Sequence, residues 1–260
     1  LHPMSDSLNT LFGFDGQVSV VIGGTGVLGG ELASGLAQAG AAVVVAGRSE
    51  ERGKARVAEI EKLGGKAAFA EVDAGDRESV KALLDTVLNE HGRVDSLVNC
   101  AGVNSPTPYF EITDEDFHKI VNTNLLATHL GCQIFGKHMV DAGRGAIVNI
   151  GSVTSYRPLS RVFIYSASKA AVLSLTQNVA REFAPHGVRV NCLCPGFFPA
   201  EQNRKIVDKS RVDSILRHTP MGRLGDNPEL IGATLLLLSP TAGSFITSEA
   251  LYVDGGFTAM

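Results

Sequence analysis

The chain has 260 residues, of which 44% are hydrophobic and 19% are charged, and this suffices for one large domain with a buried core. Its net charge is −4 and no block of basic residues occurs, so binding to nucleic acid or to an anionic membrane has no electrostatic support. No apolar run approaches the ~20 residues that cross a bilayer, and no signal-peptide pattern is present, so we expect a cytoplasmic protein.

Residues 1–3 precede Met4 and are interpreted as a tag remnant, so residues 1–13 are set apart and residues 14–260 are expected to form one domain. The cysteines and the seven histidines lack the spacing of a zinc site, and no metal ligands are expected. The cysteines are interpreted as small buried thiols. They are Cys100, Cys132, Cys192 and Cys194.

The first predicted elements are a strand over residues 17–22, a glycine-rich turn, and a helix over residues 31–39. This order is the setting of a dinucleotide-binding fingerprint, in which glycines allow a tight turn and the close approach of a pyrophosphate. The turn therefore supplies candidate cofactor-binding residues. They are Gly23, Thr25, Gly26, Val27, Leu28 and Gly29.

The end of the second predicted strand, residues 41–46, bears on the choice of cofactor. NAD-binding proteins carry an acid about 20 residues after the glycines, whereas this chain continues Gly47-Arg48-Ser49. Arg48 could pair with a 2′-phosphate and Ser49 could donate a hydrogen bond to it. We expect NADP(H) to be preferred and NAD(H) to be possible; alternatively, Arg48 is a surface residue beginning the helix over residues 49–63.

Strands and helices continue to alternate along the rest of the chain. This alternation predicts a single α/β domain with a Rossmann-like, doubly wound parallel sheet. The further strands are expected over residues 66–72, 94–99, 145–151, 188–195 and 251–254, and the further helices over residues 76–90, 113–139, 162–185 and 230–238.

The chemistry is predicted around Tyr165. Lys169 follows it by one helical turn, so a phenol and an ammonium share one helix face, and a cation beside a phenol favours the phenolate. Tyr165 is therefore a candidate acid and base near neutral pH. Ser152 follows the strand over residues 145–151 and is expected at the carboxyl edge of the sheet, where ligands bind.

Ser152, Tyr165 and Lys169, with this spacing, resemble the active site of the short-chain dehydrogenase/reductase family, from about Phe14 to Phe257. The resemblance implies strand order 3-2-1-4-5-6-7, NADP(H) chemistry on a carbonyl or secondary alcohol, and a homotetramer built through the helices that begin near Thr113 and Val162. It also implies further site residues: Asn124 as the fourth catalytic residue, Asp73 against adenine, and Asn99, Ala101, Gly102, Pro195 and Gly196 around the cofactor, which Tyr165 and Lys169 also contact.

The chain departs from the family pattern at several positions. Ile22 and Val27 replace a Thr and a Gly of the usual glycine motif, and Gly26 stands where some NADPH-binding members carry a basic residue. Cys100 replaces a second Asn. Ala200 replaces a Thr that touches the carboxamide of the cofactor in the family.

Residues 197–226 are irregular and basic, and a loop of this length is expected to be a substrate lid. With His218 and its neighbours it resembles the sugar-acid branch of the family, which includes mannonate (fructuronate) reductases and gluconate 5-dehydrogenases. Arg157 and Arg204 are candidates for binding a substrate carboxylate, and Arg161 lies near Arg157 between Ser152 and Tyr165. Two alternatives stay open: a 3-oxoacyl thioester reductase, and a non-catalytic nucleotide-binding regulator.

Overall fold

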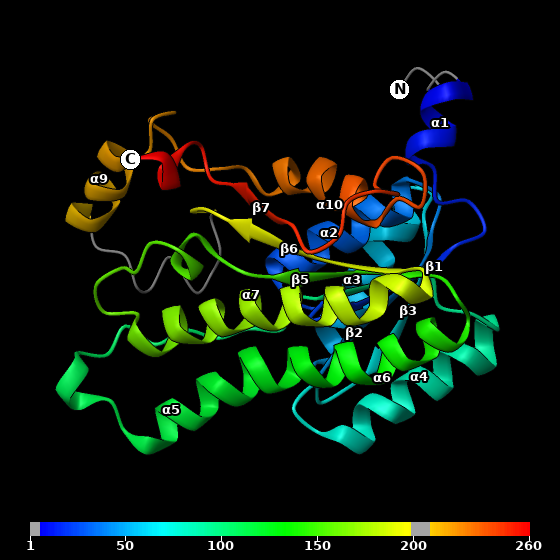
Figure 1. Ribbon diagram of the computed structural model, residues 1–260, viewed down its shortest axis with the longest axis horizontal. Coiled ribbons are helices and arrows are strands. Elements are labelled where there is room, and N and C mark those ends of the chain that lie inside the picture. Colours follow the sequence, from blue (N-terminus) through cyan, green and yellow to red (C-terminus); the bar gives the residue numbers. More distant parts are fainter. Residues whose placement is uncertain (1–5, 199–208) are drawn as a thin grey trace.

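The computed structural model describes residues 6–198 and 209–260. Its centre is a sheet of seven parallel strands in the order β3-β2-β1-β4-β5-β6-β7 (Figure 1), which confirms the predicted order. The inner strands are continuous apolar runs because both faces of a parallel sheet are covered by helices. The strands are β1 (Val18–Ile22), β2 (Ala42–Gly47), β3 (Lys66–Glu71), β4 (Ser96–Asn99), β5 (Gly145–Ile150), β6 (Val188–Pro195) and β7 (Ala250–Val253).

Helices form a layer on each face of the sheet (Figure 1). Residues of α4, α6 and α7 share one core cluster with the sheet, and residues of α2, α3 and α10 share the other. The sequence becomes helical where apolar residues recur every three or four positions. The helices named here are α2 (Val27–Gln38), α3 (Glu50–Lys62), α4 (Arg77–His91), α5 (Asp114–Val121), α6 (Ala127–Asp141), α7 (Phe163–Phe183), α9 (Lys209–His218) and α10 (Ile231–Leu238).

The central strands contribute alternate side chains to the two cores. Val20 of β1 packs in the α4–α6–α7 cluster, whereas Val21 packs in the α2–α3–α10 cluster, and both are fully buried. Leu97 and Val98 of β4 divide in the same way. Because successive residues of a strand point to opposite faces, a short apolar run supplies both cores.

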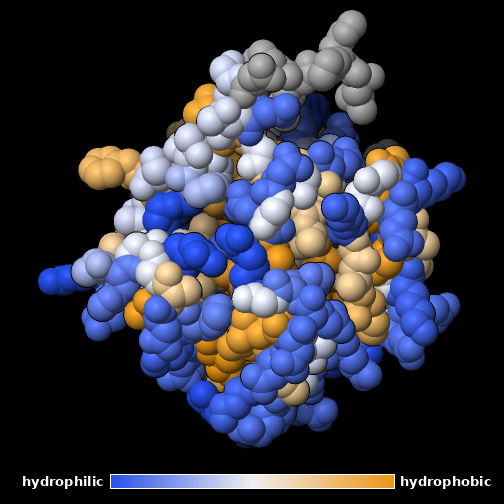
Figure 2. Space-filling model, turned by 90° about the vertical axis from the view of Figure 1, so that its right-hand side faces the viewer, coloured by the Kyte–Doolittle hydropathy of each residue, from blue (hydrophilic) through white to orange (hydrophobic). Residues whose placement is uncertain are grey.

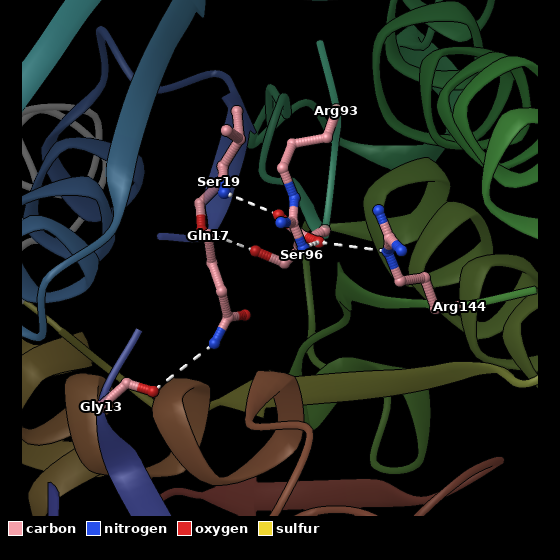
Figure 3. A network of polar contacts seen from close by, with 8 residues as sticks. Gly13, Gln17, Ser19, Arg93, Ser96 and Arg144 are labelled. Atoms are coloured by element: carbon pink, nitrogen blue, oxygen red, sulfur yellow. Dashed lines mark hydrogen bonds and ion pairs between the residues drawn. The ribbon is translucent and has the colours of Figure 1, made fainter. Parts of the chain in front are cut away.

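The amino ends of the central strands are held by a polar network around Asp95 (Figure 3). Its carboxylate accepts hydrogen bonds from the backbone N–H of Val18 (2.9 Å) and from the guanidinium of Arg93 (2.6 Å), while Arg144 lies 3.7 Å away. The backbone of Asp95 also bonds β1 and β5. The network therefore fixes this edge, which is opposite the carboxyl ends of the strands.

Three segments differ in detail from the predicted elements. Helix α2 begins at Val27 rather than residue 31, because its first turn contains two glycines and has no helical pattern to recognise. The predicted helix over residues 113–139 is α5 and α6 joined by a π-helical segment, η2 (Asn122–Leu126). The expected irregular lid contains α9, and the segment set apart at the start of the chain contains α1 (Asp6–Phe12).

The face at the right of Figure 1 is mostly hydrophilic, with apolar patches exposed between polar side chains (Figure 2). In the described part of the chain, no helix combines the length and the hydropathy needed to cross a membrane.

Candidate active site

The carboxyl ends of β1, β4, β5 and β6 meet at one edge of the sheet, together with the beginning of α7 (Figure 1). Since these strands are parallel, the turns that follow them lie side by side. The glycine-rich turn follows β1, Ser152 follows β5, and Tyr165 and Lys169 lie on the first turns of α7. The topology thus brings together residues that are far apart in the chain, such as Gly23 and Lys169.

Lys169 is buried beside Tyr165. Its Nζ lies 5.7 Å from the centroid of the tyrosine ring and donates a 2.6 Å hydrogen bond to the carbonyl oxygen of Ile150, the last residue of β5. A buried ammonium needs such acceptors because desolvation is costly. The bond also holds the first turns of α7 against the end of β5, two residues before Ser152.

Ser152 lies in a tight turn with 6% of its surface exposed. Its Oγ accepts a 3.1 Å hydrogen bond from the backbone N–H of Thr154. Ser155 Oγ accepts from the backbone N–H of Ser152 (3.2 Å) and donates to the carbonyl oxygen of Lys169 (2.9 Å). Ser155 therefore links the serine turn to α7, a role missed at the sequence level, although Ser-x-x-Ser has the spacing of a reciprocal cap.

Asn124 is fully buried in the π-helical segment η2. Its Oδ1 accepts from the backbone N–H of Val103 (2.8 Å), and its Nδ2 donates to the carbonyl oxygen of Val103 (3.0 Å) and to Ser168 Oγ (3.0 Å). Ser168 in turn donates to the carbonyl oxygen of Tyr165 (2.7 Å). Asn124 thus joins the loop after β4 to α7, and single-turn π segments are frequent at functional sites.

The turn after β4 lies between the glycine-rich turn and the catalytic candidates. A Cβ on Gly23 would lie 2.6 Å from the backbone nitrogen of Ala101, so only glycine fits, and Gly23 also has φ of +86°. A Cβ on Gly102 would lie 3.5 Å from Asn124 Oδ1 and 3.6 Å from Lys169 Nζ. Gly102 is therefore in contact distance of both side chains.

The glycine-rich turn fits a pyrophosphate. A Cβ on Gly29 would collide with the carbonyl oxygen of Gly23, whereas a Cβ on Gly26 would meet only that oxygen at 3.3 Å and is otherwise open. Gly26 is the N-cap of α2, makes no side-chain cap, and is followed by a first turn without acids. The backbone N–H groups at Val27 and Leu28 and the helix dipole can therefore receive an anion.

The end of β2 lies against the same turn. A Cβ on Gly47 would come within 2.5 Å of Thr25 Oγ1, so the end of this strand packs on the glycine-rich turn. Arg48 is exposed, and no carboxylate of the described residues forms an ion pair with it. Ser49 caps α3 by accepting from the backbone N–H of Arg52 (3.4 Å), which leaves its hydroxyl proton free to be donated elsewhere.

Two other predicted cofactor residues have local partners. Asp73 is exposed after β3, and its Oδ1 accepts from the backbone N–H of Gly75 (3.0 Å). Asn99 is buried, and its Nδ2 donates to Asn149 Oδ1 (2.8 Å) with Cys132 Sγ at 3.6 Å. The amide of Asn99 therefore contacts the core between β4, β5 and α6. A contact of Asp73 with adenine stays a prediction.

Pro195 ends β6, and Gly196 follows with its N–H bonded to the carbonyl oxygen of Val253 (2.9 Å). A Cβ on Gly196 would lie 2.7 Å from the Cα of Asp254. The chain leaving β6 is thus packed against the end of β7. Ala200, which replaces a Thr of the family pattern, lies outside the described residues.

A cavity of about 550 Å³ opens beside these strand ends, lined in part by Phe197, Met221 and Tyr252. Arg223 and Glu229 stand at its wall and form a bidentate ion pair at 2.6 and 2.9 Å. The hydrogen bonds from Arg223 lower the pKa of Glu229 to about 2. The pair joins the segment after α9 to the start of the α10 region.

The described residues do not bring the arginines that were predicted to bind substrate together in one pocket. Arg157 is exposed, and its guanidinium carbon lies 5.5 Å from the ring centroid of the neighbouring Tyr156. Arg161 is also exposed and has φ of +60°. Arg204 lies outside the described residues. Within residues 6–198 and 209–260, no group of three or more side chains that could bind a metal is found.

Known proteins are similar to this chain over nearly its whole length. A family model described as enoyl-(acyl carrier protein) reductase matches residues 26–258. A gluconate 5-dehydrogenase of Gluconobacter oxydans is 36% identical over 95% of this chain and 97% of its own. A 3-oxoacyl-[acyl-carrier-protein] reductase of Chlamydia pneumoniae is 32% identical over 94% and 97%.

Among solved structures, a gluconate 5-dehydrogenase from Burkholderia cenocepacia in complex with NADP and tartrate has 34% identity and a TM-score of 0.93. The superposition covers 97% of this chain and 99% of that chain. Similarity of this extent shows a shared fold. The chain belongs to the short-chain dehydrogenase/reductase family of oxidoreductases.

Proposed function

We propose that the protein is an NADP(H)-dependent oxidoreductase that interconverts a carbonyl and a secondary alcohol of a sugar acid or polyol. The observation that supports this most is that Asn124, Ser152, Tyr165 and Lys169 lie at one edge of the sheet, where Ser155 and Ser168 join their segments through hydrogen bonds. A regulator that only binds nucleotide has no need of all four residues. The linkage therefore favours an enzyme over a sensor.

The cofactor supplies hydride when bound, and the side chains of this chain supply the remaining requirements of carbonyl reduction. Tyr165 gives a proton to the carbonyl oxygen, and Ser152 donates a hydrogen bond to that oxygen as negative charge develops on it. The ammonium of Lys169 stabilises the phenolate that is left on Tyr165. Asn124 bonds the loop after β4. In this proposal it also takes part in the path by which protons pass from Lys169 to solvent.

Preference for NADP(H) is supported by the end of β2. An acid that would repel a 2′-phosphate is absent at residues 47–49, and Arg48 is exposed where it can pair with such a phosphate. The relative from Burkholderia cenocepacia was crystallised with NADP. Thr25, next to Gly47, brings the glycine-rich turn within reach of the same ligand.

A sugar acid is supported by relatives named gluconate 5-dehydrogenase and 5-keto-D-gluconate 5-reductase. Such a substrate needs a cation for its carboxylate and polar groups for its hydroxyls. Residues 197–226 act as its lid in this proposal, with Arg204 and Arg157 as the carboxylate-binding candidates. The cavity is lined by Phe197 and Met221, which belong to this segment, and by Tyr252.

The test is a competition between substrate classes, followed at the nicotinamide absorbance. With NADPH, fructuronate or 5-ketogluconate should be reduced with a kcat/KM at least about tenfold above that for an acetoacetyl thioester, a preference that corresponds to about 1.4 kcal/mol. Arg204→Ala should then raise KM for the acid more than it lowers kcat. Turnover of the thioester alone would replace the proposal with the 3-oxoacyl reductase.

That alternative has a specific observation in its favour, since the cavity wall contains Phe197, Phe198 and Met221, which suit an acyl chain. A relative named 3-oxoacyl-[acyl-carrier-protein] reductase is also similar over nearly the whole chain. The absence of turnover with either class, combined with tight NADPH binding, would instead favour the non-catalytic regulator.

We further propose that the protein is a cytoplasmic homotetramer. Free thiols at all four cysteines fit a reducing compartment. Phe117 on α5 and Leu126 in η2 are more than a third exposed, so the outer face of this helix pair has apolar side chains for a neighbouring subunit. Light scattering coupled to size exclusion should report four chains; a monomer at micromolar concentration would refute the assembly.

A further inference from the structure

Two thiols lie directly behind the serine turn. Cys192 and Cys194 are two residues apart in β6, so their side chains point to the same face of the sheet. Their sulfurs are 3.7 Å apart. Both residues are completely buried. They form a small cluster with Val172 of α7, away from the two main cores.

The turn that bears the catalytic serine rests on these sulfurs. A Cβ on Gly151 would lie 2.7 Å from the sulfur of Cys192 and 2.7 Å from that of Cys194, so the backbone before Ser152 packs on both. The backbone N–H of Ser152 also donates toward the sulfur of Cys194. A change at either sulfur must therefore move the backbone of Ser152.

The pKa values of the two thiols are shifted in opposite directions. A hydrogen bond from Cys192 lowers the pKa of Cys194, and the ammonium of Lys169 acts in the same direction. Donating that bond, together with burial, raises the pKa of Cys192. A thiolate is the form that reacts with oxidants, so Cys194 is the sulfur expected to react first.

A path to Cys194 begins in the cavity that Phe197 and Met221 line. Tyr252 lines this cavity, and its hydroxyl makes a hydrogen bond with Cys194. Rotation of this one partly exposed side chain would open the sulfur to a small reagent in the cavity. The remaining surroundings of the pair are packed, which favours a reaction that adds no atoms.

We propose that Cys192 and Cys194 form an oxidisable dithiol that positions Ser152, and that joining them in a disulfide inactivates the enzyme; this rests on the proposed function. Each thiol loses one hydrogen, a sulfur–sulfur bond forms, and an electrophilic azo compound such as diamide takes up both protons and both electrons to become a hydrazide. A dithiol reductant reverses the step.

The disulfide can form, but its formation changes the backbone around Ser152. Residues two apart in a strand have Cα atoms about 6.6 Å apart, at the upper limit of the roughly 4.4–6.8 Å that disulfides span, so closing the bond also bends the strand between them. The sulfurs must approach from 3.7 Å to about 2.05 Å, which moves the two atoms on which Gly151 packs and weakens the contact of the Ser152 N–H with Cys194. Ser152 then leaves the position from which it bonds the reacting oxygen.

The covalent step can be measured without any substrate. After diamide treatment, free thiols are blocked with N-ethylmaleimide and the chain is digested with trypsin. Cleavage at Arg189 and Arg204 releases both thiols in one peptide, residues 190–204, whereas Cys100 and Cys132 fall in separate peptides. The proposal expects the first peptide to lose two hydrogens and its maleimide labels, and dithiothreitol to restore them.

The positioning role is measured by kinetics on the same samples. As the disulfide fraction rises, kcat should fall by at least about tenfold, while the Kd for NADPH changes by less than about twofold, because Ser152 contacts the substrate oxygen. Cys192→Ser and Cys194→Ser should each abolish the diamide effect relative to their own untreated activity. Cys132→Ser, a buried thiol on α6, should retain it in full.

Inhibition that persists in both serine variants would overturn the proposal, and so would an inhibited parent enzyme whose peptide 190–204 stays fully labelled. If the variants do not fold, the parent alone decides, since lost activity must follow the disulfide fraction. If no substrate is turned over, the proposed function fails while the mass spectrum still decides whether the dithiol forms.

Discussion

Tyr165 and Tyr156 lie on either side of the same loop and allow a matched comparison. Tyr165→Phe removes the proposed acid and keeps the packing of the ring, so kcat/KM should fall by about 10²–10⁴-fold, the usual contribution of a general acid. Tyr156 is 64% exposed, and Tyr156→Phe should leave kcat/KM within about twofold of the parent, as expected for an exposed side chain outside the chemistry. Steady-state kinetics and melting temperatures of both variants check this; equal activities would remove Tyr165 from the mechanism.

Arg48 should decide between the two nicotinamide cofactors. Arg48→Ala removes a charge-assisted hydrogen bond worth about 1.5–3 kcal/mol, so the KM for NADPH should rise about ten- to hundredfold while that for NADH stays nearly constant. Arg52→Ala, one turn further along α3 and also exposed, is the control. Equal Michaelis constants for NADPH and NADH in the parent would contradict the assignment.

At the scale of elements, the π-helical segment η2 turns one side chain inward and leaves its neighbour outside. Asn124→Ala leaves the N–H and the carbonyl oxygen of Val103 without their partner, which should lower the free energy of unfolding by about 1–3 kcal/mol and also lower kcat. Asn122→Ala, exposed in the same segment, should change stability by less than about 0.5 kcal/mol. Denaturant unfolding of the two variants checks this. Equal stabilities would contradict the role of Asn124 in bonding Val103.

The order of the elements was predictable because apolar runs and glycine turns are local signals, and the strand order followed from the family resemblance. The contacts within the site were not. Nothing in the sequence indicates that Asn124 bonds Val103, that Ser155 bridges to Lys169, or that Cys194 supports Ser152, because each pairing joins segments brought together only by tertiary packing. Arg204, the substrate prediction on the lid, lies outside the described residues.

At the scale of the whole molecule, the network of Figure 3 should affect stability without affecting chemistry. Asp95→Ala removes the carboxylate that Val18 and Arg93 share, so the free energy of unfolding should fall by about 1–3 kcal/mol, the typical cost of leaving a buried N–H without its partner. Asp85→Ala, exposed on α4, is the control. Because the network lies at the amino edge, kcat/KM of the folded variant should match the parent; a selective loss of catalysis would contradict this separation.

The strand order also divides the protein for recombination between relatives. The cofactor half, β1 to β3, meets the half with the catalytic residues along the β1–β4 ladder, where Ser19 and Ser96 hydroxyls lie 2.6 Å apart. A second seam runs between α2 and α10, where a Cβ on Gly35 would collide with Ile231. A chimera that exchanges one half can exchange cofactor preference and substrate range independently, provided that the residues of both seams come from the same parent.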